Sequence, residues 1–168
     1  GGGSGTALIA NTNTSTSASN FLQIGTTTSD IITLADNLRI TNAAGAGASG
    51  SVNILAAIGG AGDVTFSNAN TGIGQAGSIR LGGATNTFTG SILVQKGTVA
   101  FSASKSLGNS SNVVTLGQSG QGRAALLATS TGSTIENSII VAAGSGGPLT
   151  LGKINTGEAT YSGPIKLN

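Results

Sequence analysis

Four residue types are missing from this 168-residue sequence: it contains no cysteine, histidine, methionine or tryptophan. Without cysteine the chain can form no disulfide bond, so burial of apolar side chains and backbone hydrogen bonds must stabilise the fold. Without cysteine and histidine, transition metals lose their usual ligands. The acidic residues are also few and dispersed, so we expect no bound metal and no organic cofactor.

Charge is scarce as well. Charged residues make up 7% of the chain, against about 25% in an ordinary soluble domain. The seven basic and five acidic residues leave a net charge of +2, and no basic cluster is present, so the sequence does not predict nucleic-acid binding. No apolar run approaches the roughly 18 residues of a membrane helix, so we expect no membrane insertion of this segment.

Glycine, threonine, serine and asparagine dominate what is present, and they favour turns and strand surfaces over helix interiors. No stretch shows the apolar spacing of an amphipathic helix. Short strand-like runs recur instead between turn-forming clusters such as 43–50, 59–62 and 144–147. We expect strands at residues 30–34, 37–41, 51–55, 63–66, 78–81, 91–95, 98–101, 112–116, 138–142, 148–151 and 164–167.

Several of these runs alternate between apolar and polar or small residues, which predicts one buried face and one wet face. We therefore expect ten side chains to point inward: Val99, Phe101, Val114, Leu116, Ile139, Val141, Leu149, Leu151, Ile165 and Leu167. Aromatic residues make up only 3% of the chain. A sandwich core usually draws on larger side chains, whereas stacked valine, isoleucine, leucine and alanine fill a narrow solenoid core.

An internal repeat supports the solenoid. Residues 87–94 align with residues 160–167 at a constant offset of 73 residues. The alignment pairs Phe88 with Tyr161 and Gly90 with Gly163, so we expect these pairs to occupy equivalent rungs and turns. With coils of roughly 20–30 residues, the chain should form about six to eight coils.

The repeat also carries a family resemblance. Residues 79–90 (Ile-Arg-Leu-Gly-Gly-Ala-Thr-Asn-Thr-Phe-Thr-Gly), followed by 92–94 (Ile-Leu-Val) and 96–99 (Lys-Gly-Thr-Val), resemble the autotransporter-associated β-strand repeat, also called the passenger-associated transport repeat. That repeat typically has leucine-x-glycine, then asparagine-threonine-tyrosine-threonine-glycine, then a strand and a glycine-threonine-leucine step. Phe88 replaces the usual tyrosine, and Tyr161 keeps it in the second copy. The similarity is good over residues 78–168 and looser over residues 1–77.

The resemblance implies a right-handed parallel β-helix, an all-β β-solenoid, within a secreted or cell-surface bacterial passenger. We expect residues 1–168 to be one solenoid segment of a longer chain, with divergent coils over 1–77 and clearer repeats over 78–168. The repeat is scaffold, so the resemblance implies no catalytic residues. Its partners would be further coils of the same chain or copies of itself, as in a filament.

No motif in the sequence strongly indicates a catalytic site. Glycoside hydrolysis needs two carboxylates roughly 5–10 Å apart, and the five acids are spread along the chain: Asp30, Asp36, Asp63, Glu136 and Glu158. We interpret Asp30 and Asp36 as turn caps at strand edges. Residues 102–105 fit the S-x-x-K pattern of penicillin-binding enzymes but lack its helix and its K-T-G partner, so a polar turn is the better interpretation.

Two functions remain open. The first is a structural element without enzymatic activity: a stalk, surface fibre or sheath segment. The second is an adhesin-type module that recognises glycans or host surfaces, for which the sequence offers few exposed aromatic residues. The bare apolar runs at 7–10 and 165–167 favour the first, because a solenoid end without a polar cap offers both apolar core and unpaired backbone groups.

Overall fold

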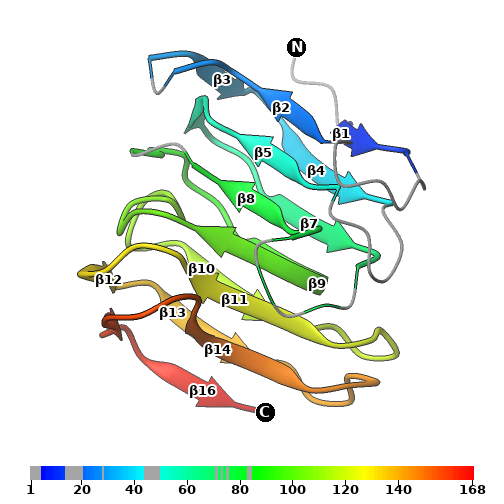
Figure 1. Cartoon of the computed structure of the whole chain (residues 1–168), viewed down its shortest axis with the longest axis vertical. Helices are drawn as coiled ribbons and strands as arrows, with labels where there is room; N and C mark the ends of the chain where they lie inside the picture. Colours follow the sequence, from blue (N-terminus) through cyan, green and yellow to red (C-terminus); the bar gives the residue numbers. More distant parts are fainter. Residues whose placement is uncertain are drawn as a thin grey trace.

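The computed structural model describes residues 5–13, 21–27, 29–43, 50–70, 72, 74, 76–82 and 85–168. These residues form sixteen β-strands and no helix, and the strands pair in parallel. The strands stack level by level from the β1 end to the β16 end (Figure 1). The fold is therefore all-β, a parallel β-solenoid, as the sequence predicts. Since the described chain has no helix, it has none that could span a membrane.

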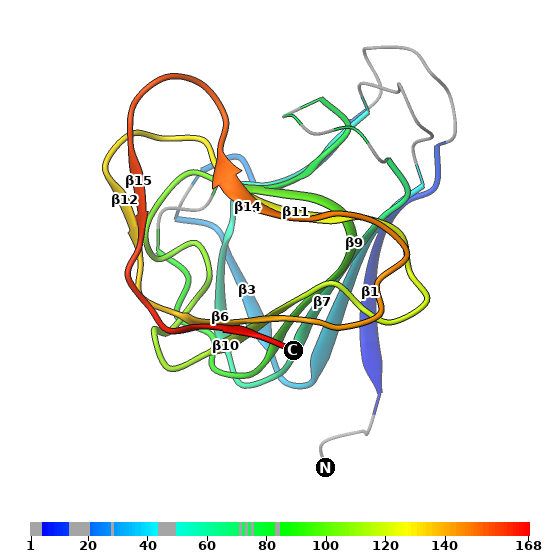
Figure 2. The same cartoon turned by 90° about the horizontal axis from the view of Figure 1, so that it is seen from below.

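The turns of the solenoid pass along three sides, as a view along the stack shows (Figure 2). Their inward side chains form one hydrophobic core. Side one is a single parallel ladder. Its strands in order are β1 (Thr6–Asn11), β4 (Asn37–Asn42), β7 (Val64–Asn68), the first half of β9 (Ile92–Phe101), β10 (Val113–Leu116), β13 (Ser138–Val141) and β16 (Ile165–Leu167).

Side two is a second ladder that shares β9 with the first, because β9 continues round the corner between them. Its other strands are β2 (Leu22–Ile24), β5 (Val52–Ile54), β8 (Ile79–Leu81), β11 (Ala124–Ala128) and β14 (Leu149–Lys153). Side two thus has six strands, with about five turns between its first and its last. This is slightly fewer coils than the six to eight expected, because some turns are long: Asn11 and Asn42 are stacked neighbours 31 residues apart.

Side three is interrupted. It contains one strand pair near the start of the chain, β3 (Ile31–Leu34) with β6 (Ala57–Gly60), and another near its end, β12 (Ser133–Ile135) with β15 (Ala159–Tyr161). Between these pairs, the described residues form only two isolated bridges, which join Ala61 to Thr89 and Thr85 to Lys105. The turn that contains β9 therefore crosses side three as a loop rather than as a strand.

The core is a column of stacked apolar side chains. Because parallel strands pair in register, residues at one level repeat the direction of those above and below. One inward column on side one contains the buried residues Leu38, Val64, Ile92, Val114 and Ile139. Such burial stabilises by about 25 cal/mol per Å² of apolar surface, with no need for large aromatic side chains.

The alternation correctly predicts the direction of the ten inward residues, but not the burial of all of them. Five are buried: Val99, Phe101, Val114, Leu116 and Ile139. Three pack against the core while partly exposed: Val141, Leu149 and Leu151. Ile165 and Leu167 continue the same columns, in register with Ile139 and Val141, yet remain 48% and 76% exposed because no described turn covers them.

The internal repeat corresponds to three turns of the solenoid. Gly90 precedes β9 and Gly163 precedes β16, and these strands are three steps apart on side one. Each glycine packs against a backbone carbonyl of the preceding turn, that of Gly62 for Gly90 and that of Asn137 for Gly163. Phe88 and Tyr161 each lie two residues before the glycine of their segment. Phe88 is part of the buried core, and Tyr161 is partly buried and packs against it. The strands that follow are equivalent, since Ile92 and Ile165 lie in one column three steps apart. The aromatic positions differ, because Tyr161 lies in β15 whereas Phe88 lies outside any strand.

The strand predictions were incomplete. Residues 91–95 and 98–101 were expected as two strands and form the single strand β9. Residues 59–62 were expected as a turn, but β6 extends to Gly60. Five other strands were not expected from the sequence: β1, β2, β11, β12 and β15.

Candidate functional site

The end of the solenoid at β16 exposes its core. β16 pairs only with β13, so its outer edge has no strand partner among the described residues. Its two inward side chains, Ile165 and Leu167, are both exposed. The turn above contributes further partly exposed apolar side chains: Val141, Leu149, Leu151, Ala159 and Tyr161. This surface, the β16 end, combines apolar side chains with a free strand edge.

The opposite end of the solenoid, the β1 end, is of the same kind. Within the part of the chain that the structure describes, β1, β2 and β3 each pair with one strand only, namely β4, β5 and β6. Ile9, Leu22, Ile24 and Ile32 pack on the core but are only partly buried. Leu8 and Ile31 point away from the core and are 62% and 70% exposed. An exposed strand edge beside apolar surface is a template for pairing with another strand.

The two ends are consecutive positions of one repeating pattern. A single outward column on side one runs from Leu8 at the β1 end to Lys166 at the β16 end. The adjacent inward column runs from Ala7 to Ile165 through the same pairings. A β1 end placed below a β16 end would therefore continue both the hydrogen-bonded ladder and the core column.

Tyr161 closes part of the core at the β16 end. Its ring stands edge-on to Phe101, with ring centroids 6.4 Å apart. Its hydroxyl donates to the Gly152 carbonyl oxygen at 2.8 Å and lies 3.0 Å from the Leu126 carbonyl oxygen. Burial raises the pKa of Tyr161 to about 12. The phenol is thus neutral and acts as a hydrogen-bond donor that ties two strands of side two together.

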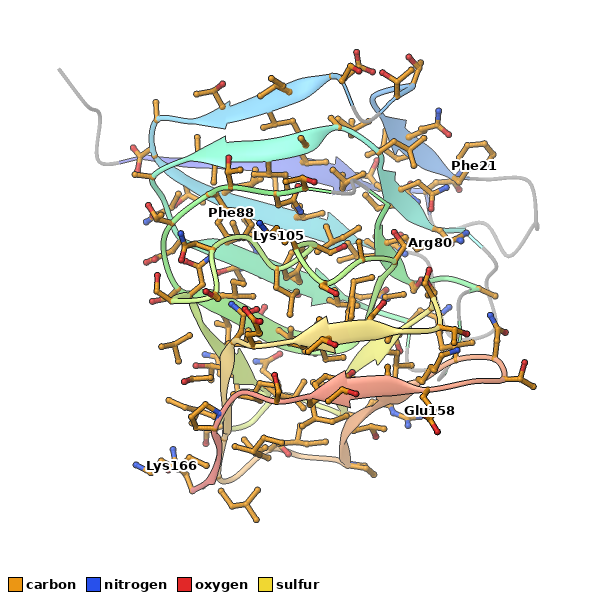
Figure 3. All side chains as sticks on the ribbon, turned by 90° about the vertical axis from the view of Figure 1, so that its left-hand side faces the viewer. Phe21, Arg80, Phe88, Lys105, Glu158 and Lys166 are labelled. Atoms are coloured by element: carbon orange, nitrogen blue, oxygen red, sulfur yellow. The ribbon has the colours of Figure 1, made fainter. Side chains whose placement is uncertain are left out.

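A polar groove of about 370 Å³ opens on side three, where that side is interrupted. Its walls come from the turns above and below the β9 turn, and its floor is the loop after β9. Figure 3 looks onto this side and labels Lys105 next to Phe88. The lining residues are Asn86, Thr87, Ser104, Lys105, Gly108, Asn109, Ser110, Thr134, Glu136 and Asn137.

Three of the five acids serve turns. Asp30 Oδ2 accepts hydrogen bonds from the Thr26 and Thr27 amides at 2.7 and 3.0 Å, and these bonds lower the pKa of Asp30. Asp36 accepts from the Asn37 amide at 2.8 Å, so both predicted turn caps are confirmed. Asp63 accepts from the Ser91 amide of the next turn at 2.7 Å.

The two glutamates play no such part. Glu136 lines the groove, and Glu158, labelled in Figure 3, is exposed. No group of three or more acidic residues that could hold a metal ion occurs in the described chain.

The sequence did not predict the groove, because residues 102–105 were interpreted simply as a polar turn. The one available signal was Leu107, an apolar residue inside a long polar stretch. Leu107 is completely buried, and its insertion into the core recesses the loop around it.

Comparisons with protein-family models, with curated proteins and with solved structures found no match to this chain. The interpretation of both candidate sites therefore depends on geometry and chemistry alone.

Proposed function

We propose that this chain is a structural β-solenoid scaffold, a stalk, fibre or sheath segment, that is extended through its two open ends. The observation that carries the proposal is the exposure of core columns and unpaired strand edges at both ends, in a common register. Further coils of the same chain or a second copy would cover them. Contact between two different ends, head to tail, builds open filaments rather than closed dimers.

The low charge of the chain supports this proposal. Only 7% of the residues are charged, so little electrostatic repulsion opposes association of the apolar ends. Most acids serve turns rather than a reaction centre, which favours scaffold over catalysis. The resemblance to the autotransporter-associated repeat supports a secreted or cell-surface location, where such scaffolds act.

Sedimentation velocity of the isolated 168-residue chain tests the proposal. We expect a concentration-dependent series of oligomers, and a shift to monomer when Ile165→Lys and Leu167→Lys are combined. Both side chains are already exposed, so the double variant should fold. Val113→Lys is the matched control, because Val113 is an exposed apolar residue on β10, which has a strand partner on each side, and it should leave association unchanged. A monomeric wild-type chain at high concentration would contradict the proposal.

A further inference from the structure

The polar groove on side three is a shaped and internally braced surface. Leu107 fills the core, and the Asn112 side chain holds it there by donating to the Leu107 and Phe88 carbonyl oxygens at 3.1 and 3.0 Å. The Asn86 side chain donates to the Ser106 carbonyl oxygen at 2.6 Å. From below, the Thr134 amide donates to Ser104 Oγ at 2.9 Å. The floor is therefore tied to both walls, so a ligand would find the groove already formed.

Several polar groups of the groove have no partner among the described residues. The ammonium group of Lys105, the carboxylate of Glu136 and the hydroxyl of Ser110 make no hydrogen bond or ion pair there, and all three residues are exposed. Asn109 uses its side-chain oxygen to accept from Ser111, which leaves its amide NH₂ able to donate. The groove thus presents donors and acceptors side by side.

The chemistry of this lining defines a class of ligand. One cation and one anion cancel, so the groove favours neither acidic nor basic ligands. No aromatic or large apolar side chain lines it, so an apolar ligand would gain little there. Sugar hydroxyl groups both donate and accept hydrogen bonds, and they match this mixture of ammonium, carboxylate, amide and hydroxyl groups.

We propose that this groove binds a short, uncharged oligosaccharide. Glu136 accepts from sugar hydroxyls, Lys105 and Asn109 donate to them, and Ser110 does either. Because no aromatic ring stacks on the sugar, hydrogen bonds alone hold it, and affinity is low, with a dissociation constant on the order of 1 mM. The site lies on the flank of the solenoid, so it functions whether or not the ends are covered.

Saturation-transfer NMR with three neutral probes tests this site: maltotriose, cellotriose and triacetylchitotriose, with the acidic trisaccharide sialyllactose for comparison. We expect saturable transfer to at least one neutral probe. Combining Lys105→Ala with Glu136→Gln should weaken it about tenfold or more, because two charge-assisted hydrogen bonds are lost. The matched control combines Lys96→Ala with Glu158→Gln, which makes the same charge changes outside the groove and should leave binding intact.

Three results would overturn the proposal: no saturable transfer to any neutral probe, transfer that survives the groove variant, or binding of sialyllactose alone. Circular dichroism of both double variants shows whether the solenoid is intact. None of these outcomes depends on self-association, so the failure of this site and the failure of end-to-end assembly are distinguishable.

Discussion

Buried asparagine side chains explain why this sequence is rich in a residue that most cores avoid. Asn42 donates to the Gly50 and Gly77 carbonyl oxygens, and Asn68 donates to those of Gly77 and Thr98. The Asn137 side chain donates to the Asn109 and Asn112 carbonyl oxygens. These side chains satisfy backbone carbonyls at corners, where the ladder hydrogen bonds stop. An unsatisfied buried group of this kind costs about 1–3 kcal/mol, so the asparagines are part of the fold.

Tyr161 makes stability depend on alkaline pH. Its pKa is raised to about 12 in the folded chain, against about 10 in an unfolded chain. Between these values the unfolded state loses the phenolic proton while the folded state keeps it. The stabilisation is therefore complete below about pH 10 and is lost as the pH rises toward 12.

Denaturant unfolding at about pH 9 and pH 11 checks this expectation, with Tyr161→Phe as the comparison. The wild-type chain should lose more stability between the two pH values than the variant does. Tyr161 is the only tyrosine and the chain has no tryptophan, so tyrosinate absorbance reports its titration directly. A titration midpoint near 10 in the folded chain would show that the hydroxyl is not buried as described.

β9 shows how a single element can join two sides of the solenoid. At the corner, Gly97 adopts a φ of 73°, and the pairing with β7 shifts register between Phe66 and Ser67. A Cβ at Gly97 would contact the Asn68 carbonyl oxygen and lie 2.6 Å from Asn68 Cβ. Glycine is thus required here both for its left-handed conformation and for the close approach of the turn above.

Gly97→Ala and Gly120→Ala separate these two requirements. Gly120 has nearly the same φ, 72°, but no atom within 4 Å of its added Cβ. Gly120→Ala should cost only the conformational term, about 1–2 kcal/mol. Gly97→Ala should cost that amount plus about 1–3 kcal/mol from overlap with Asn68. Equal losses in urea unfolding would show that β9 does not pass so close to β7.

The strands that sequence predicts are those with visible alternation. β10 and β13 alternate, and both were expected. β11 (Ala124–Ala128) shows no alternation, because its outward residues Ala125 and Leu127 are buried along with the inward ones. β6 (Ala57–Gly60) contains two glycines, and these fall in residues 59–62, which were interpreted as a turn. In both cases stacking between turns overrides local propensity, as tertiary context does for strands in general.

The candidate sites differ in how far the sequence reveals them. The apolar, uncapped runs 7–10 and 165–167 are visible in the sequence, and they form strands at the two ends. The groove is not visible, because its lining comes from three successive turns: Asn86 bonds Ser106 across 20 residues of sequence, and Asn137 bonds Asn109 across 28. Lys105 and Glu136 line the same groove only because successive turns stack in register. That register depends on the length of each turn, which no local sequence pattern reveals.

At the scale of the whole molecule, the described residues form one stack of turns. Each turn contacts its neighbours above and below, and stability in such arrays is a sum of turns and interfaces between turns. The central strands are covered on both sides, whereas β1 and β16 are covered on one. Addition of a further turn at either end would bury side chains and pair backbone groups that are now exposed.

An engineered disulfide tests this account most directly, since the chain contains no cysteine of its own. Leu8 and Lys166 occupy one outward column at opposite ends. If copies stack in register, Leu8→Cys of one copy lies beside Lys166→Cys of the next, about 4.8 Å away across adjacent strands and within disulfide range. Gln23→Cys with Lys166→Cys is the control, because Gln23 lies on side two.

Non-reducing electrophoresis after mild oxidation gives the readout. The account predicts a ladder of covalent oligomers for the Leu8→Cys, Lys166→Cys chain, and none for the control pair. A ladder from both pairs would indicate random collision, and an absence of oligomers from the first pair would contradict head-to-tail extension of the solenoid.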